Sequence, residues 1–515
     1  MKTEFTRRGF LSTVSQGMLV ASVGSLAFDM EIAKAASSEP EMKPITFGSL
    51  EPLVFLMQET PIDKFLPTLV ERMNQGTDLK SLVAAAALAN ARTFGGEDYI
   101  GYHTLMALAP AWHMSQATAG PRQALPVLKV LYRNTNQMGA RGGHKAEVLH
   151  QITPISMSPG DSGVDALKAA VLAKDISRAD STFAAMMQKG PREAFDELLY
   201  TVQEDTQVHR TVLPYRAWEL LSLVGEENAL TMLRQSVHYC VREQSRQSPS
   251  PTLAKVFDQH KLMSRDVGDR AADDQWIDSM CQTIFGSTPD QAADAVAAAL
   301  AEGFSPDAIG EALGLAANQL VLRDTGRTAR QEWPGKPIGS VHGDSVGVHA
   351  SDSANAWRNM ASVGHKRNQY ACLILGAYQV ARDRIQGGGD YLNLPPLPLD
   401  VEWKKIKTNE PDKLLAELDA AIRGNLQAQA CNIVSHYGQL GHDPKPMFEV
   451  LLKYGTSEDG ALHAEKYYRT TTEEFARTRP AFRWRHAISL ARVTASEYGR
   501  PAPGYAEACE LLKVT

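Results

Sequence analysis

Four histidines recur at comparable places along this sequence: His103, His209, His349 and His463. Each begins a stretch with helical spacing of apolar residues, and each stretch is followed by a turn and a second stretch of the same kind. Imidazole is a common protein ligand for transition metals. If the four units fold alike, their imidazoles can meet at one point. The spacing therefore predicts a metal site made of these four side chains.

The segments around the histidines resemble one another. In the first two units a tryptophan follows nine residues after the histidine (Trp112 and Trp218), and a glycine interrupts the pattern a few residues later. At about 100° per residue, nine residues place the tryptophan opposite the histidine, so the histidine has a helix face of its own. The third unit has its tryptophan at Trp357 and breaks at Gly364, whereas the fourth is looser and breaks at Pro480. This self-similarity predicts an all-α fold, a helical repeat superhelix of four related His-bearing helix-turn-helix units at about 50–140, 190–247, 300–386 and 410–500.

A purely structural role is the alternative for these histidines, since a histidine in a helical solenoid can also cap its unit by bonding to a neighbouring backbone. Three other histidines do not share the register and are expected to pack or cap: His113, His238 and His486. Three more are second-tier candidates for a pocket wall: His144, His150 and His342. The Gly-rich and Pro-rich loops at 139–160 and 323–346 are candidate lids, with disordered loops as the alternative.

The ligand type alone does not choose the metal, because imidazole suits iron, zinc, copper and nickel. Four imidazoles would close a tetrahedral zinc site, so a zinc hydrolase would need one histidine outside the shell. Lys466 lies three residues after His463, on the same helix face. A lysine beside a metal can add carbon dioxide and become a carbamate, an oxygen donor, although a solvent-facing lysine is the ordinary alternative. Asp352 and Asn355 after His349, and Glu465 beside His463, could orient ligands or protons, or merely cap or be solvated.

Composition excludes several functions. A formal net charge of −6, with both signs evenly scattered, provides no basic stripe for nucleic acid. The five cysteines include no C-x-x-C-H motif, which argues against c-type haem, and they are expected to be buried thiols. No strand-Gly-x-Gly-x-x-Gly-helix fingerprint occurs, so a dinucleotide in a Rossmann domain is not expected.

The N-terminus resembles a twin-arginine export signal. Arg7 and Arg8 precede a short apolar stretch, and Ala33-Lys34-Ala35 fits a cleavage site. We therefore predict a signal peptide at 1–35 and an all-helical metal-binding domain at 36–515. The predicted location is periplasmic or extracytoplasmic, with the twin-arginine translocase as a transient partner. The apolar stretch is too short for a membrane span, so no stable membrane insertion is expected after cleavage.

Two segments, LHAEKYYRTTTEEF and RPAFRWRHAISLARVTASEYG, together with the four histidine units, resemble the questin oxidase-like family. Its fungal members oxidise and ring-open anthraquinone-type polyketides, and the family includes non-haem iron dioxygenases with four histidine ligands and a carboxylated lysine. The resemblance extends from about residue 50 to residue 498. It implies His103, His209, His349 and His463 as iron ligands and Lys466 as the carbamate. The export signal and an insertion at about 323–346 depart from the fungal enzymes, so the substrate is not inherited.

These observations together predict an exported metalloenzyme, a non-haem iron-dependent oxygenase acting on an aromatic or quinone-like small molecule. Fe(II) is the expected cofactor, with zinc and copper as alternatives. Lys466, Asp352 and Glu465 are the candidate catalytic residues. The competing hypotheses are a helical-repeat binding or scaffold protein without catalysis and a zinc-dependent hydrolase.

Overall fold

The computed structural model describes residues 43–158, 160–244, 248–332, 336–343, 345–388 and 390–514. The chain divides into two units, Met1–Lys43 and Pro44–Thr515. The predicted signal peptide at 1–35 lies outside the described residues. All helices in the described ranges belong to the second unit.

The second unit is built of helices. No strand occurs in the described ranges, which contain three isolated bridges only. The α-helices are α2 (Glu51–Glu59), α3 (Ile62–Asn74), α4 (Leu79–Phe94), α5 (Tyr99–Gln116), α6 (Leu125–Ala140), α7 (Gly163–Leu172), α8 (Ile176–Met186), α9 (Pro191–Val202), α10 (Val208–Glu219), α11 (Leu221–Val224), α12 (Ala229–Arg242), α13 (Ser250–Gln259), α14 (Asp274–Gly286), α15 (Pro289–Ala301), α16 (Pro306–Leu322), α17 (Val346–Val363), α18 (Lys366–Gln386), α19 (Asp400–Trp403), α20 (Pro411–Arg423), α21 (Gln427–Gln439), α22 (Pro444–Ser457), α23 (His463–Arg477), α24 (Trp484–Glu497) and α25 (Tyr505–Leu511). Short 3₁₀ helices are η1 (Gly48–Leu50), η2 (Gly120–Ala124), η3 (Gly143–Ala146), η4 (Met187–Lys189), η5 (Glu226–Asn228), η6 (Leu262–Ser264) and η7 (Ala329–Gln331). The prediction of an all-α fold is confirmed.

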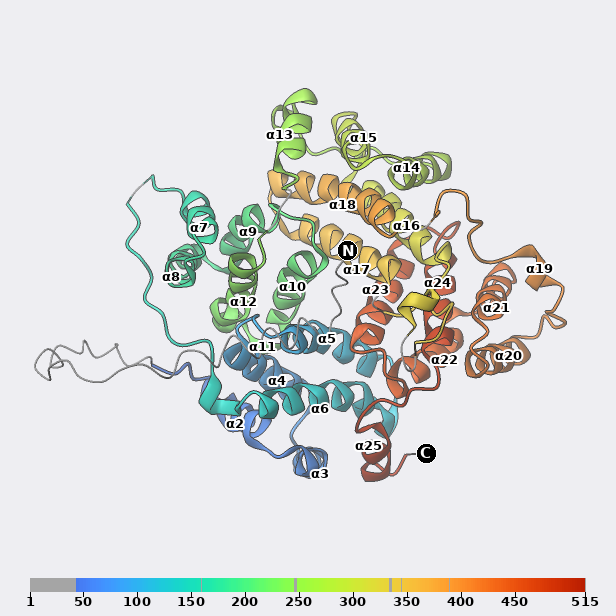
Figure 1. Ribbon diagram of the computed structural model, residues 1–515, viewed down its shortest axis with the longest axis horizontal. Coiled ribbons are helices and arrows are strands. Elements are labelled where there is room, and N and C mark those ends of the chain that lie inside the picture. Colours follow the sequence, from blue (N-terminus) through green and yellow to red (C-terminus); the bar gives the residue numbers. More distant parts are fainter. Residues whose placement is uncertain are drawn as a thin grey trace, which may run out of the picture. The chain divides into compact units, whose positions relative to one another are not determined.

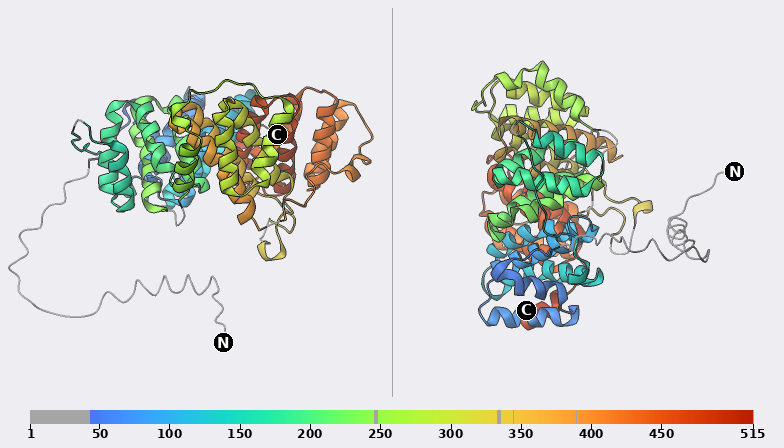
Figure 2. Two further views of the ribbon diagram at one scale, coloured as in Figure 1. Left: turned by 90° about the horizontal axis from the view of Figure 1, so that it is seen from above. Right: turned by 90° about the vertical axis from the view of Figure 1, so that its left-hand side faces the viewer.

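Four helices form a ring in the middle of this unit. Helix α5 packs on α10, α10 on α17, α17 on α23, and α23 back on α5. Figure 1 shows the four around the centre, with α6, α12, α18 and α24 outside them. Each ring helix packs on the outer helix that follows it, and the long helices run side by side (Figure 2). The ring helices are the ones that begin at or near the four recurrent histidines, so the fold assembles the segments that the sequence singled out.

Further helices cover the ring from outside. Helix α4 packs on α5 and α6, and α16 packs on α17 and α18. The predicted units omit α7 and α8, which pack on α12, and α13 to α15, which lie along α18 and α16 (Figure 1). A superhelix of four related units is not established by these contacts and stays a prediction. No helix among the described residues is both long enough and apolar enough to cross a bilayer.

Three ring helices start at polar caps. Asp98 accepts a hydrogen bond from the backbone N–H of Gly101 at the start of α5, Gln207 caps α10, and Ser345 caps α17. A side-chain oxygen at this position satisfies an N–H that lacks a partner inside the helix. Helix α23 has no such side-chain cap and follows Leu462, whose φ of 70° is left-handed. Each histidine therefore lies within about one turn of its helix start.

Candidate metal centre

The four recurrent histidines converge. The Nε2 atoms of His103 and His209 lie 3.1 Å apart, and so do those of His349 and His463. Between these pairs, the ring centroids of His103 and His463 are 5.3 Å apart and those of His209 and His349 are 6.0 Å apart. Because all four residues are near helix N-termini, the ring helices run parallel, with the imidazoles at one end. The side chains that the sequence predicted to meet do meet.

Backbone contacts fix the ring protons of two histidines. Nδ1 of His103 lies 2.7 Å from the carbonyl oxygen of Tyr99, and Nδ1 of His463 lies 3.1 Å from that of Ala461. A carbonyl oxygen can only accept, so both neutral rings carry their proton on Nδ1. Their Nε2 lone pairs then face the centre. Metal-bound histidines in proteins usually have this arrangement.

The centre favours neutral imidazoles. His103 is 2% exposed and His463 is 4% exposed. Burial, reinforced by the charge of Lys466, holds the pKa of both rings well below the usual value and lowers the pKa of His209 to about 3. A metal ion binds the unprotonated nitrogen, so rings that resist protonation are ready to serve as ligands.

The spacing suits a transition metal. With metal–nitrogen bonds of about 2.0–2.1 Å, two nitrogens on one ion lie about 2.9–3.3 Å apart, for angles from a right angle to a tetrahedral one. The two Nε2 pairs at 3.1 Å fall in this range. Among the described residues, no three His, Cys, Asp or Glu side chains already stand in finished coordination geometry. The two pairs would therefore have to close toward each other around an ion.

Lys466 lies beneath the imidazoles and is 2% exposed. Burial lowers the pKa of this ammonium group to about 8, partly opposed by Asp352, while Arg216 lowers the pKa further. Its charge in turn acts on His103, His209 and His463. The structure thus places Lys466 beside the histidines in a buried setting, and the solvent-facing alternative does not apply.

Asp352 shares this buried layer. Its Oδ1 accepts a hydrogen bond of 2.8 Å from Thr470, and burial raises the pKa of its carboxyl group against the opposing charges of Lys466 and Arg216. Arg216 continues the network to Glu219 through an ion pair of 2.6 Å. The inside of the helix ring below the histidines is therefore polar and charged. Asp352 provides a negative charge that acts on the buried Lys466.

Glu465 and Asn355 face elsewhere. Glu465 is fully buried and forms an ion pair of 2.7 Å with Lys129 on α6. Asn355 donates to Glu474 at 2.9 Å. Both side chains join helices together, so the structure supplies a packing role for each and no contact with the four imidazoles.

The remaining histidines have partners of their own. His113 contacts Glu219, His238 lies between Asp180 and Glu97, and His486 contacts Thr478, in keeping with the packing roles expected of them. His144 is exposed and its ring bonds to Glu147, while the backbone of His150 forms an isolated β-bridge with that of Pro44. These contacts do not join His144 or His150 to the imidazole centre. His342 is 2% exposed, beside Glu497.

The loop that contains His342 covers His463. A Cβ placed on Gly343 would lie 2.0 Å from Cβ and 2.7 Å from Cγ of His463. The loop is tied to α24, since Val341 N–H donates to Ser496 at 2.7 Å and Gly343 N–H donates to Glu497 at 3.1 Å. The part of the predicted lid that lies here is a fixed cover, and only glycine fits at its contact with the histidine.

Backbone strain accompanies His463. Ala461 and Leu462, the two residues before it, both have left-handed φ values, 49° and 70°. Such conformations cost about 1–3 kcal/mol for residues other than glycine and gather at functional sites. They turn the Ala461 carbonyl toward Nδ1 of His463. The strained turn thus orients the ring of His463.

Aromatic rings flank the His103–His209 pair. The ring of Tyr99 lies 4.3 Å from that of His103, and Tyr102 lies 5.2 Å from His209. Tyr99 is 62% exposed, and His349 is half-buried, so the centre is not sealed from solvent. The cavity that borders Ala464 and Tyr467 holds only about 10 Å³, close to the space of one water. An aromatic ligand would not fit in that cavity.

Comparisons with other proteins do not add to these observations: no family model, no curated protein and no solved structure matches the chain. The resemblance to the questin oxidase-like family stays a prediction.

Proposed function

We propose that this protein is a metalloenzyme, a non-haem iron-dependent oxygenase that acts on an aromatic or quinone-like small molecule. The observation that supports it best is the meeting of four imidazoles from four separate helices, three of them buried. A scaffold protein has no need to bring four polar rings together at a buried point, because each ring loses hydration there.

His103, His209, His349 and His463 would hold the ion through Nε2. Ferrous iron bound there would supply the redox chemistry for reaction with dioxygen. The carbonyls of Tyr99 and Ala461 keep two of the rings in the required tautomer, and burial shields His103, His209 and His463 from most of the solvent.

Lys466 is proposed as an additional ligand, after addition of carbon dioxide to its amine. Its burial and its position one helical turn from His463 support this role. Asp352 would orient the lysine side chain, since both lie in the same buried layer. The notion of Glu465 as a catalytic residue has less support, because Lys129 holds that carboxylate.

The aromatic surroundings support the substrate class. Tyr99 offers a largely exposed ring directly beside His103, where a flat substrate could stack. Tyr102 and Tyr239 extend this aromatic wall behind His209. The substrate itself is not specified by these contacts.

The proposal extends to the repeat architecture, export and other cofactors. The four helix pairs would be copies of one unit in a repeat superhelix. The chain would be exported by the twin-arginine translocase as a folded, metal-loaded protein and work outside the cytoplasmic membrane, without inserting in it. No haem, Rossmann-bound dinucleotide or nucleic acid would take part.

Elemental analysis of protein purified without a chelator or a histidine tag tests the metal. We expect near-stoichiometric iron, with oxygen consumption when aromatic and quinone substrates are supplied. Stoichiometric zinc would favour hydrolytic or structural use of the site, and copper another redox reaction. No bound metal after reconstitution with any of these ions would refute the proposal.

Single histidine variants test the assignment. Replacement of any of the four by alanine should lower metal occupancy sharply while most helix content remains. His260, which bonds to Asp294 on the outer surface, provides the matched control. Four variants that keep full metal would show that the ion binds elsewhere.

A further inference from the structure

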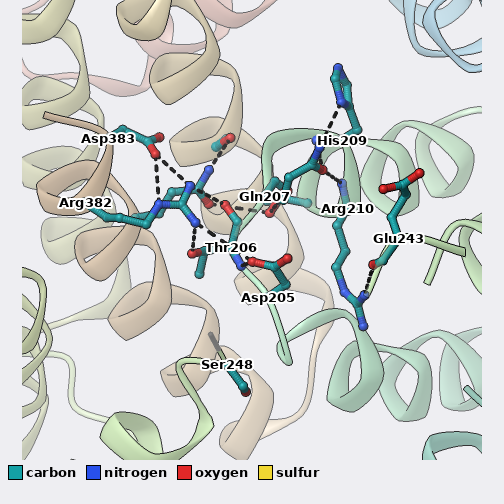
Figure 3. A network of polar contacts seen from close by, with 12 residues as sticks. Asp205, Thr206, Gln207, His209, Arg210, Glu243, Ser248, Arg382 and Asp383 are labelled. Atoms are coloured by element: carbon teal, nitrogen blue, oxygen red, sulfur yellow. Dashed lines mark hydrogen bonds and ion pairs between the residues drawn. The ribbon is translucent and has the colours of Figure 1, made fainter. Parts of the chain in front are cut away.

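Gln207 lies beside His209 in a fixed orientation. Its Oε1 accepts hydrogen bonds from the backbone N–H groups of His209 and Arg210, at 3.0 and 3.1 Å, and from the hydroxyl of Tyr239, at 2.9 Å. Backbone N–H groups can only donate, so the oxygen must be on this side of the amide. The amide nitrogen then lies 3.3 Å from Nδ1 of His209 (Figure 3).

The orientation of Gln207 decides the tautomer of His209. An amide NH₂ only donates, so Nδ1 of His209 accepts, and the neutral ring carries its proton on Nε2. That proton points at Nε2 of His103, which lies 3.1 Å away. Nε2 of His103 is unprotonated and can accept, because Nδ1 of His103 donates to the carbonyl of Tyr99. A directional chain runs from Gln207 through both imidazoles to a backbone carbonyl.

This tautomer is the wrong one for a metal ligand. His103 and His463 donate from Nδ1 to carbonyl oxygens and present Nε2 lone pairs, whereas His209 presents Nε2–H. For His209 to bind an ion through Nε2, its proton must move to Nδ1, where the Gln207 amide already donates. The ring stays neutral throughout, and only the place of the proton changes.

The segment that carries Gln207 is anchored. Arg382 on α18 donates to the carbonyl oxygen of Thr206 at 2.9 Å and is paired with Asp383 at 2.7 Å (Figure 3). Thr206 is 1% exposed. Gln207 also caps α10, so rotation of its amide would expose two helix N–H groups.

We propose that Gln207 is a positioning residue that holds His209 in the Nε2–H tautomer and so weakens it as a metal ligand through Nε2. This inference rests on the proposed metal centre. One neutral hydrogen bond typically changes an equilibrium constant about two- to tenfold. The amide therefore keeps the affinity of the centre about two- to tenfold below the value expected with the His209 proton on Nδ1.

Two substitutions separate the tautomer from charge. Gln207→Met removes the donor without adding charge, and Gln207→Glu keeps an oxygen for the helix cap while offering an acceptor to Nδ1. We expect both to lower the Kd for ferrous iron and for zinc about two- to tenfold, in competition titrations with chelators. The matched pair Gln188→Met and Gln188→Glu, at an exposed position, should leave Kd unchanged.

The ring protons of the metal-free protein provide an independent measurement. Long-range ¹H–¹⁵N spectra of ¹⁵N-histidine-labelled protein, assigned with His209→Gln, should place the His209 proton on Nε2 in the wild type and on Nδ1 in Gln207→Glu. A wild-type proton on Nδ1 would overturn the proposal, as would a lower Kd for Gln207→Glu alone.

The measurement also separates this inference from the proposed function. If no metal binds, the proposed metal centre is refuted. An Nε2–H in the wild type and an Nδ1–H in Gln207→Glu would still show that residue 207 controls the tautomer of His209. If Gln207→Met does not fold, Gln207→Glu and its spectrum decide the matter.

Discussion

Replacement of Gly343 by alanine should weaken the metal centre through a steric effect alone. The new Cβ would lie 2.0 Å from Cβ of His463, whereas carbons in contact lie about 3.5–4.0 Å apart. One of the two must move by roughly 1.5 Å. Hydrogen bonds from Val341 and Gly343 to α24 hold the loop, so we expect His463 to move.

The size of the effect depends on the tolerance of a metal–ligand bond, which is about 0.2 Å. A shift of roughly 1.5 Å removes His463 from the ion. We expect the Kd for ferrous iron to rise at least about tenfold, a loss of about 1.4 kcal/mol or more. Overpacking should also cost about 1–3 kcal/mol of folding free energy without metal.

Chelator competition gives the metal Kd, and urea unfolding of the metal-free protein gives the stability. Gly286→Ala on α14 is the control, since a Cβ there meets nothing within 4 Å. If Gly343→Ala folds, binds iron within about twofold of wild type and unfolds at the same urea concentration, the cover does not fix His463.

Substitutions at three other positions should have measurable effects. Lys466→Ala should abolish most activity, whereas Lys453→Ala, which alters an exposed lysine paired with Asp419, should leave it intact; equal activities in a substrate assay would exclude a ligand role for Lys466. Ala461→Gly should leave the free energy of unfolding unchanged or raise it slightly, because relief of about 1 kcal/mol of left-handed strain offsets the flexibility of glycine. The control Ala416→Gly in α20 should lower the free energy of unfolding by about 1 kcal/mol. Urea midpoints that fall equally in both variants would argue against strain at Ala461. Burial alone would lower the pKa of His238, but its bonds to Asp180 and Glu97 outweigh burial and raise the pKa. The stabilisation by the protonated ring is therefore complete below about pH 6.5 and is lost as pH rises through the folded-state pKa. His238→Gln should cost more stability at pH 6 than at pH 9, and an equal loss at both would show that the ring stays neutral.

The helical class and the four-histidine centre could be predicted from sequence, because both depend on patterns within single segments. Helical spacing marks each ring helix, and His103, His209, His349 and His463 occupy similar places in their helices. The predicted units missed α7, α8 and α13 to α15, which lack the histidine signal and occupy the gaps between the units. The closure of the ring depends on the contact between α23 and α5, which no local sequence pattern encodes.

Residues around the site were less accessible to prediction. Gly343 matters because of a loop that folds over His463 from far along the chain. Glu465 is a candidate catalytic residue by sequence only because it lies two residues after His463. Its ion-pair partner, Lys129, belongs to α6, far away in the sequence. The left-handed φ of Leu462 contradicts the preference of its residue type. Gln207 did have a local signal, because it is a polar residue at a helix start, two positions before one of the four recurrent histidines.

The positions of the four recurrent histidines in the sequence have a consequence for assembly. His103 and His209 are separated by 106 residues, and His349 and His463 by 114, so each imidazole pair joins distant parts of the chain. A growing chain has no complete binding site until α23 docks against α5. An ion held by all four side chains binds the finished fold and shifts the folding equilibrium toward it by mass action. Metal binding would then distinguish completely folded molecules from incomplete ones.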